Sequence, residues 1–189
     1  MGSVFITGGS RGIGAACVRA FAEAGRPAAF TYSARRDKAE ALAAETGALA
    51  LCADSADRDA VENAVKTARE SLGAIDTVVC NAGIAQQKLF QDITDDEWLT
   101  MLNVNLMGAV RTIRAALPDM LHRQKGSIVI VSSMWGERGA SCESHYAASK
   151  AALIGLSRSL ALELGPSGIR VNCVAPGVIA TDMNAMHGG

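Results

Sequence analysis

The chain has 189 residues, of which 49% are hydrophobic and 20% charged, with a formal net charge of −1. This composition is typical of one globular domain spanning residues 1–189, and the near-zero net charge argues against a nucleic-acid-binding protein. No apolar run approaches the roughly 18 residues of a membrane span, and the N-terminus lacks the features of a secretory signal. The five cysteines form no CxxC pair and the three histidines show no metal-ligand spacing. We therefore expect a cytoplasmic protein without a metal site.

Short β-branched runs alternate with amphipathic helical stretches along the whole chain. Strands are expected at residues 3–7, 28–33, 48–52, 75–80, 127–132 and 169–174. Helices are expected at about residues 12–24, 36–46, 57–72, 95–124 and 145–165. The fourth of these is expected to bend or break because it contains Gly108 and Pro118. The alternation predicts an α/β fold: a Rossmann-like, doubly wound parallel sheet in three α/β/α layers with right-handed crossovers.

A glycine-rich loop joins the first expected strand to the first expected helix. It reads Thr-Gly-Gly-Ser-Arg-Gly-Ile-Gly over residues 7–14, with glycines spaced GxxxGxG. Glycines at these positions let the backbone approach a diphosphate at the helix N-terminus, where exposed N–H groups and the helix dipole favour an anion. A strand before the loop and a helix after it therefore predict a dinucleotide site.

The charges after the second expected strand bear on which dinucleotide binds. An acidic residue there would bind the ribose 2′-hydroxyl of NAD and repel a 2′-phosphate. This strand is instead followed by Ala-Arg-Arg, with no acid before Asp37. Arg35, with Arg11 in the glycine-rich loop, is expected to attract the 2′-phosphate of NADP(H). The alternative is that Arg35 and Arg36 merely begin a solvated helix.

Three polar residues in the second half of the chain carry groups suited to proton transfer. Tyr146 and Lys150 lie four residues apart, which on a helix places both side chains on one face. A neighbouring ammonium favours the phenolate and lowers the pKa of a phenol from ~10, so Tyr146 is expected to exchange a proton with a substrate oxygen near neutral pH. Ser133 follows a strand-like run and is expected to hydrogen-bond the same oxygen. The alternative is a surface tyrosine with a solvated lysine one turn later.

These motifs together resemble the short-chain dehydrogenase/reductase family over nearly the whole chain. The resemblance is carried by the glycine-rich loop, Asn81-Ala-Gly83, Asn105, Ser133, Tyr146 with Lys150, and Pro176-Gly177. It implies that Tyr146 is the general acid and that Ser133 orients and polarises the carbonyl. It also implies that Lys150 holds the nicotinamide ribose, and that Asn105 holds a water linking Lys150 to solvent.

The resemblance also implies a set of dinucleotide contacts. Asp54 is expected at the adenine, residues 81–83 at the floor of the site, and Pro176, Gly177 and Thr181 at the nicotinamide end. The full set expected to contact the dinucleotide is Thr7, Gly8, Ser10, Arg11, Gly12, Ile13, Gly14, Tyr32, Arg35, Asp54, Asn81, Ala82, Gly83, Tyr146, Lys150, Pro176, Gly177 and Thr181.

Within the family the chain most resembles bacterial 3-oxoacyl-acyl-carrier-protein reductases. Residues 84–90, 133–136, 140–143 and 182–184 resemble, more narrowly, elongation factor P 5-aminopentanone reductases. These resemblances imply NADPH-dependent reduction of a ketone to a secondary alcohol by a homo-oligomer, a tetramer or dimer, with the substrate on acyl carrier protein or on elongation factor P. The alternative of another class is a non-catalytic dinucleotide-binding module.

The two substrates would need different charges around the site. Docking of an acyl carrier protein needs a basic surface, for which Arg123 and Lys125 are candidates. An aminoketone would suit an acid near the pocket, and Glu137 and Glu143 are candidates, with a solvated loop as the alternative for both. Family members also continue beyond the Pro-Gly turn with a helical lid, a last helix and a seventh strand, so these C-terminal elements are expected to be missing from this chain.

Overall fold

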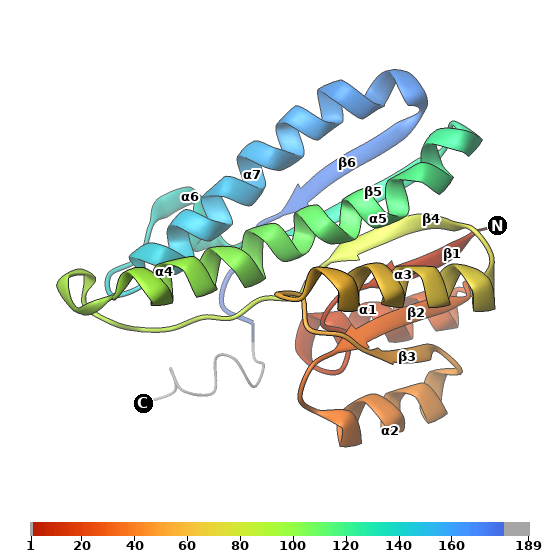
Figure 1. The fold of residues 1–189 in the computed structure, drawn as a ribbon, viewed down its shortest axis with the longest axis horizontal. Coiled ribbons are helices and arrows are strands. Elements are labelled where there is room, and N and C mark those ends of the chain that lie inside the picture. Colours follow the sequence, from red (N-terminus) through yellow and green to blue (C-terminus); the bar gives the residue numbers. More distant parts are fainter. Residues whose placement is uncertain (1, 180–189) are drawn as a thin grey trace.

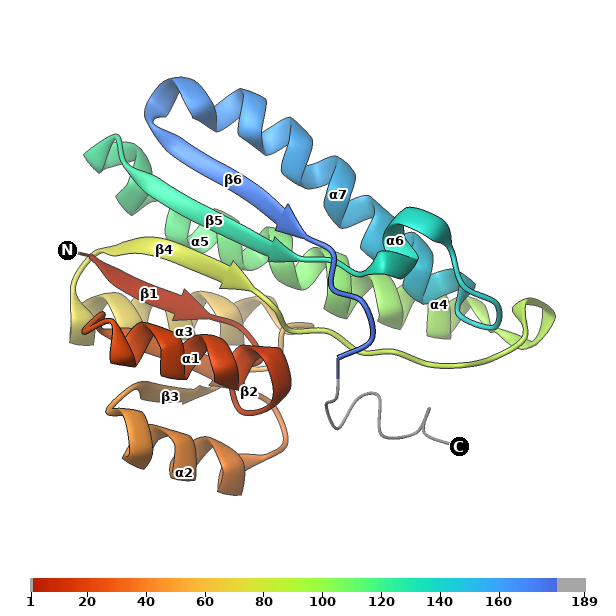
Figure 2. The same cartoon turned by 180° about the vertical axis from the view of Figure 1, so that it is seen from behind.

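A six-stranded parallel sheet forms the centre of the structure, a computed structural model that describes residues 2–179. Its strands are β1 (Ser3–Ile6), β2 (Ala28–Tyr32), β3 (Leu49–Cys52), β4 (Ile75–Cys80), β5 (Gly126–Val131) and β6 (Ile169–Val174). They lie in the order β3-β2-β1-β4-β5-β6, and every neighbouring pair is parallel (Figures 1 and 2). The predicted Rossmann-like doubly wound sheet is confirmed. The first and last residues of every strand lie within one residue of their expected positions.

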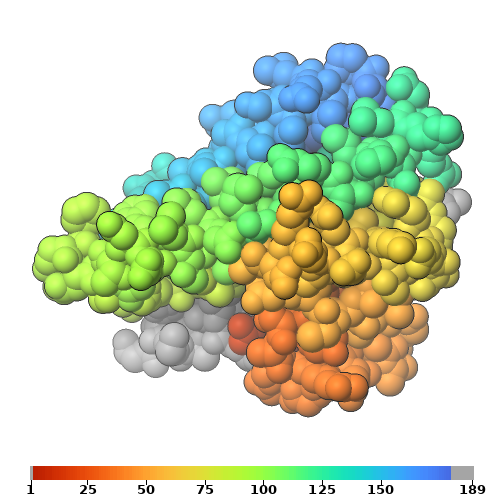
Figure 3. Space-filling view, viewed as in Figure 1, coloured from red at the N-terminus to blue at the C-terminus, as the bar shows by residue number. Residues whose placement is uncertain are grey.

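Helices cover both faces of the sheet, as the alternation predicted. They are α1 (Gly12–Glu23), α2 (Arg36–Thr46), α3 (Arg58–Leu72), α4 (Asp95–Leu102), α5 (Gly108–Arg123), α6 (Met134–Arg138) and α7 (Ser144–Leu164). Helices α1 and α2 pack on one face, where Val18 and Leu42 contact the cluster around Phe30. Helices α3, α5 and α7 pack on the other, through residues such as Ile113 and Leu153, and Figure 3 shows them side by side. Short α6 was not predicted.

The central strands β1, β2 and β4 are largely apolar because helices bury them from both sides, whereas β6 alternates buried residues with exposed ones such as Arg170 and Asn172. All residues of β1 are buried, and Val4 and Ile6 belong to the core on the α1 side while Phe5 belongs to the core on the α3 side. Parallel strands buried on both faces are expected to be apolar throughout. Because strand order reverses beside β1, a crevice forms at the carboxyl ends of β1 and β4, where sheets of this kind bind ligands.

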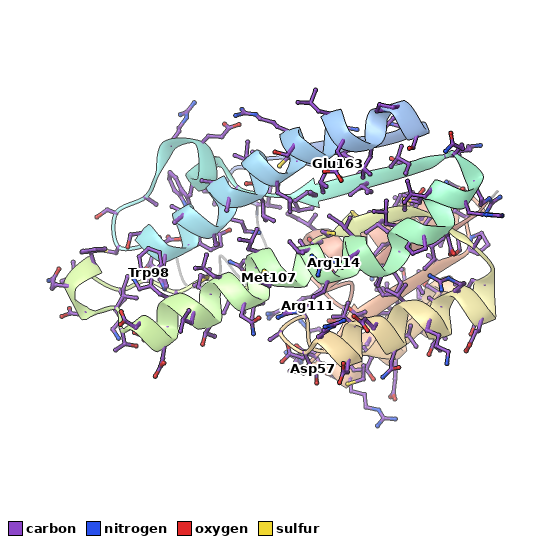
Figure 4. The ribbon with its side chains drawn as sticks, turned by 45° about the horizontal axis from the view of Figure 1, so that its top comes forward. Asp57, Trp98, Met107, Arg111, Arg114 and Glu163 are labelled. Atoms are coloured by element: carbon purple, nitrogen blue, oxygen red, sulfur yellow. The ribbon has the colours of Figure 1, made fainter. Side chains whose placement is uncertain are left out.

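The expected long helix over residues 95–124 breaks, and it breaks before Gly108. Residues Asn103–Met107 form a π-helical turn between α4 and α5, while α5 runs on through Pro118. Such a turn frees backbone carbonyls, and the Arg111 guanidinium donates hydrogen bonds to the carbonyls of Asn103 (3.2 Å) and Ser55 (3.1 Å). Figure 4 shows Arg111 reaching from α5 towards the start of α3. The turn directs Asn105 into the protein interior.

Two features are absent from residues 2–179. None of the helices there is both long enough and apolar enough to cross a membrane. Over the same residues, no group of three or more His, Cys, Asp or Glu side chains is arranged to hold a metal ion.

Candidate active site

A cavity of about 800 Å³ lies at the carboxyl ends of the strands. Most of the predicted dinucleotide contacts line it: Gly8, Ser10, Arg11, Gly12, Ile13, Tyr32, Arg35, Asp54, Asn81, Ala82, Gly83, Pro176 and Gly177. Ser133, Tyr146 and Lys150 line the same cavity. Thr7, Gly14 and Asn105 lie behind the wall, and Thr181 lies outside the described residues. The fold thus gathers both predicted groups around one space.

The glycine-rich loop needs its glycines for close backbone packing. Gly8 has a φ of +65°, and a Cβ there would lie 2.9 Å from Cα of Ala82. A Cβ on Gly14 would lie 2.2 Å from the carbonyl oxygen of Gly8. Helix α1 begins at Gly12, and its N-cap residue Arg11 makes no side-chain hydrogen bond to the first-turn amides. These amides border the cavity through Gly12 and Ile13. The glycine-rich loop and the first turn of α1 thus form a cradle that fits the diphosphate of a dinucleotide.

Thr7 and Asn81 link the glycine-rich loop to the end of β4 by hydrogen bonds. The Thr7 hydroxyl accepts hydrogen bonds from the backbone N–H groups of Asn81 (3.0 Å) and Ala82 (3.1 Å). The Asn81 amide donates in return to the carbonyls of Thr7 and Gly8, both at 3.0 Å. Thr7 was predicted to contact the dinucleotide; in the structure it is buried and holds the residues that border the cavity. Gly14 likewise lies behind the wall, where it allows α1 to approach the loop.

The end of β2 brings charged residues to the cavity. Arg35 lines it and forms an ion pair with Asp37 at 3.0 Å, and this partner lowers the pKa of Asp37 to about 2. Arg36 does not line the cavity and pairs instead with Glu40 at 2.7 Å. Of the two arginines after β2, only Arg35 is therefore placed to meet a ligand in the cavity.

Ser133 is positioned by the end of β5 and the start of α6. It is the N-cap of α6, and its hydroxyl accepts a hydrogen bond from the backbone N–H of Trp135 at 3.2 Å. On either side, the N–H of Ser132 donates to Val174 (2.8 Å) and that of Met134 to Pro176 (2.9 Å). This pairing holds Ser133 and the turn at Pro176 against each other on the cavity wall.

Tyr146 and Lys150 lie one turn apart on α7, as their spacing predicted. The two residues are 9% and 4% exposed, and the Lys150 ammonium lies 5.7 Å from the centre of the Tyr146 ring. The ammonium donates a hydrogen bond to the carbonyl of Val131 at 3.0 Å. Burial lowers the pKa of Lys150 to about 8. The alternative of a solvated surface pair is therefore wrong.

The pKa of Tyr146 departs from the sequence prediction. We expected Lys150 to lower it, but burial raises it above its ordinary value, against a smaller lowering by a hydrogen bond with Ser133. The carboxylate of Glu143 raises it further. The physical reason is that a buried phenolate loses its hydration, which outweighs the favourable contacts present. Tyr146 consequently stays a protonated phenol across neutral pH.

Asn105 connects the π-helical turn to two other segments. Its side-chain oxygen accepts a hydrogen bond from the N–H of Ile84 (2.8 Å), and its amide donates to the Ile84 carbonyl (3.0 Å) and the Ser149 hydroxyl (2.9 Å). It was predicted as a catalytic residue beside Lys150. In the structure it does not line the cavity, but a Cβ on Gly83 would lie 3.1 Å from its side-chain oxygen and 3.4 Å from Nζ of Lys150, so the catalytic role beside Lys150 stays a prediction. Asn105 here positions the loop after β4 against α7.

Ser149 was not predicted as a site residue, and the sequence left open whether Glu137, Glu143 and Trp135 border the pocket. Ser149 is fully buried and links Asn105 to the Tyr146 carbonyl, at 2.9 and 2.7 Å. Its polar character within an otherwise small, apolar stretch of α7 was the available signal. Glu143 lines the cavity, whereas Glu137 does not. Trp135 also lines it.

Known proteins resemble this chain over almost its full length. A profile of the family described as short chain dehydrogenase matches residues 3–188. The 3-oxoacyl-acyl-carrier-protein reductase FabG of Staphylococcus aureus is 39% identical over 186 residues, covering 96% of this chain and 76% of the relative. The acetoacetyl-CoA reductase of Synechocystis is 40% identical over 180 residues, covering 95% and 72%. A cyclic-di-GMP-binding biofilm dispersal mediator protein of Escherichia coli is 42% identical over 187 residues, covering 98% and 76%.

A solved structure shares the fold closely. It is a double mutant of a short-chain dehydrogenase/reductase from Serratia marcescens, with a TM-score of 0.93 and 38% identity, covering 100% of this chain and 78% of that one. The chain thus spans about three quarters of the length of these proteins.

Proposed function

Since this chain belongs to the short-chain dehydrogenase family, whose members are oxidoreductases that use a nicotinamide dinucleotide, we propose that it is an NADPH-dependent reductase of 3-oxoacyl thioesters. The observation that carries this proposal is the single cavity shared by the glycine-rich loop and by Ser133, Tyr146 and Lys150. A dinucleotide bound in the cradle supplies the hydride that converts a ketone to a secondary alcohol.

The side chains of this protein supply the proton and the orientation. Tyr146, whose pKa lies above that of an ordinary phenol, is protonated at neutral pH and donates its proton from the phenol oxygen to the carbonyl oxygen as negative charge develops there. The Ser133 hydroxyl, which hydrogen-bonds with Tyr146, orients the same carbonyl oxygen. Lys150 contributes a buried positive charge one turn away and donates a hydrogen bond to the Val131 carbonyl; its proposed role is to bind a ribose hydroxyl of the dinucleotide.

The preference for NADPH rests on Arg11 and Arg35. Both line the cavity, and a 2′-phosphate on the adenosine ribose would gain charge-assisted hydrogen bonds from them. Replacing both by alanine is expected to raise KM for NADPH about tenfold, while KM for NADH stays within about twofold. Steady-state kinetics with each dinucleotide at saturating ketone measure both constants.

Arg36→Ala is the matched control for these two arginines. It removes a positive charge next to Arg35 that does not line the cavity and that pairs with Glu40. It should leave both KM values unchanged. Equal losses with NADPH and NADH in the double variant, or a wild-type protein that prefers NADH, would contradict the assignment.

The substrate assignment is supported by the relatives named for 3-oxoacyl-acyl-carrier-protein and acetoacetyl-CoA. Acyl carrier protein is accordingly the proposed partner and a homo-oligomer the proposed assembly, whereas elongation factor P finds no support among the relatives described above. The test is consumption of NADPH with acetoacetyl thioesters.

The relative named for cyclic-di-GMP binding makes a non-catalytic module the second candidate. NADPH binding with no turnover of any ketone would favour this second candidate. The presence of Ser133, Tyr146 and Lys150 in one cavity favours the enzyme.

A further inference from the structure

Glu143 places a carboxylate in the cavity next to the proton donor. It immediately precedes α7, is only 6% exposed, and lines the same cavity as Tyr146. Residues three apart at the start of a helix lie on the same side of it, so Glu143 and Tyr146 face the cavity together. The carboxylate is close enough to act electrostatically on the Tyr146 phenol.

No cation neutralises this carboxylate within residues 2–179. Glu143 forms no ion pair there, and its carboxylate accepts one hydrogen bond, from the neutral side-chain amide of Gln87 at 3.4 Å. Ile84, Met134 and Trp135 contribute apolar wall to the same cavity. A charge held among apolar groups interacts more strongly with a ligand than a charge in water does, because the local dielectric constant is lower.

Charged side chains of both signs border the cavity, with Asp54 in addition to Arg11 and Arg35, and with Lys150 in addition to Glu143. Arg11 and Arg35 border the part formed by the glycine-rich loop and the end of β2, where a phosphate is expected. Glu143 borders the part formed by α7, where Tyr146 would meet the carbonyl; the Lys150 ammonium also borders this part and donates a hydrogen bond to the Val131 carbonyl, where the proposed function has it bind the ribose. An anionic group on the substrate near the reacting carbonyl would lie close to this carboxylate, and repulsion would oppose its binding.

We propose that Glu143 selects ketones by charge, so that this cavity rejects those bearing an anionic group beside the carbonyl and accepts neutral or positively charged ones. This inference rests on the proposed ketone reduction. A 3-oxoacyl thioester is neutral beside its carbonyl, whereas the free 3-oxo acid carries a carboxylate at that position. Glu143 would thus discriminate between the esterified substrate and its hydrolysed form.

The test compares acetoacetate with acetoacetamide, which have almost the same shape and differ in charge. In the wild-type protein kcat/KM for acetoacetamide should exceed that for acetoacetate. In Glu143→Gln, which keeps the size of the side chain and a partner for Gln87, this ratio should fall about tenfold. The two ketones differ in intrinsic reactivity, but this difference is the same in both proteins and does not affect the change in the ratio. A general effect of the substitution on Tyr146 alters kcat/KM for both ketones equally and also leaves the ratio unchanged. A positively charged ketone gives a second comparison. In the wild-type protein kcat/KM for N-(2-aminoethyl)acetoacetamide should exceed that for the neutral N-propylacetoacetamide, and in Glu143→Gln this difference should disappear.

Glu137→Gln is the matched control, because it removes a nearby glutamate charge that does not border the cavity. It should leave the ratio at the wild-type value. An unchanged ratio in Glu143→Gln, or an equal change in Glu137→Gln, would overturn the inference. Calorimetric binding of 3-hydroxybutyrate and 3-hydroxybutyramide gives the same comparison without turnover. If no ketone is reduced, the proposed function fails, and the binding ratio still decides the role of Glu143.

Discussion

Replacing Tyr146 by phenylalanine is expected to lower kcat for ketone reduction by about 10²- to 10⁴-fold, the range that a positioned general acid contributes. The substitution removes the phenol oxygen and leaves the ring, which packs one turn from Lys150 on α7. Within residues 2–179 no other phenol borders the catalytic end of the cavity, and the Ser133 hydroxyl is far less acidic than a phenol. Steady-state kinetics with acetoacetyl thioester and NADPH measure the loss.

The affinity of Tyr146→Phe for the dinucleotide distinguishes the loss of the proton donor from a general disturbance of the structure. The cradle for the diphosphate is built from the β1–α1 loop, with Thr7 and Asn81 behind it, and none of its hydrogen bonds involves the Tyr146 hydroxyl. The dissociation constant for NADPH in Tyr146→Phe, followed by fluorescence, should stay within about threefold of wild type. Retained turnover in this variant would show that the proton comes from elsewhere.

Replacing Lys150 by methionine is expected to stabilise the fold while abolishing activity. Burial lowers the Lys150 pKa from 10.5 to about 8, and this difference corresponds to roughly 3 kcal/mol of unfavourable free energy for the buried ammonium. The lost hydrogen bond to the Val131 carbonyl offsets roughly 1 kcal/mol of the gain. The free energy of unfolding at pH 7, from urea denaturation, should therefore rise by about 2 kcal/mol.

The pH dependence of this difference has a definite sign. Between the folded pKa, about 8, and the unfolded value of 10.5, the unfolded chain binds more protons at residue 150 than the folded chain. The destabilisation by Lys150 is therefore fully present below pH 8 and is relieved as the pH rises through this window. The advantage of Lys150→Met should accordingly shrink between pH 7 and pH 10. Lys125→Met, at an exposed lysine, should show no comparable gain; a destabilised Lys150→Met would contradict the account.

The positions of the strands were predictable because the pattern that marks them is local in the sequence. Strands buried on both faces must be apolar throughout, and runs such as Val4 to Ile6 show this directly. The glycine-rich loop was likewise visible, since Gly8 and Gly14 stand where a side chain would collide with neighbouring backbone. The spacing of Tyr146 and Lys150 also translated into one helix face.

Features that depend on contacts distant in the sequence were not predictable. The π-helical turn at Asn103–Met107 is held by hydrogen bonds from Asn105 to Ile84 and Ser149, far from it in the chain. The sequence therefore suggested a break at Gly108 or Pro118. For Tyr146 the sequence displayed the neighbouring charge of Lys150 but not the burial that raises its pKa. The placement of Glu143 inside the cavity, with Glu137 outside it, also required the fold.

The most direct test of the proposed activity is the stoichiometry of NADPH oxidation and alcohol formation, measured with purified protein. Acetoacetyl thioester is incubated with NADPH deuterated at the transferring position, and oxidation of the dinucleotide and formation of alcohol are measured together. We predict one secondary alcohol for each NADPH oxidised, with deuterium on the carbinol carbon, and loss of both signals in Tyr146→Phe. Tight binding of NADPH without formation of any alcohol would contradict the assignment of this cavity as a reductase site.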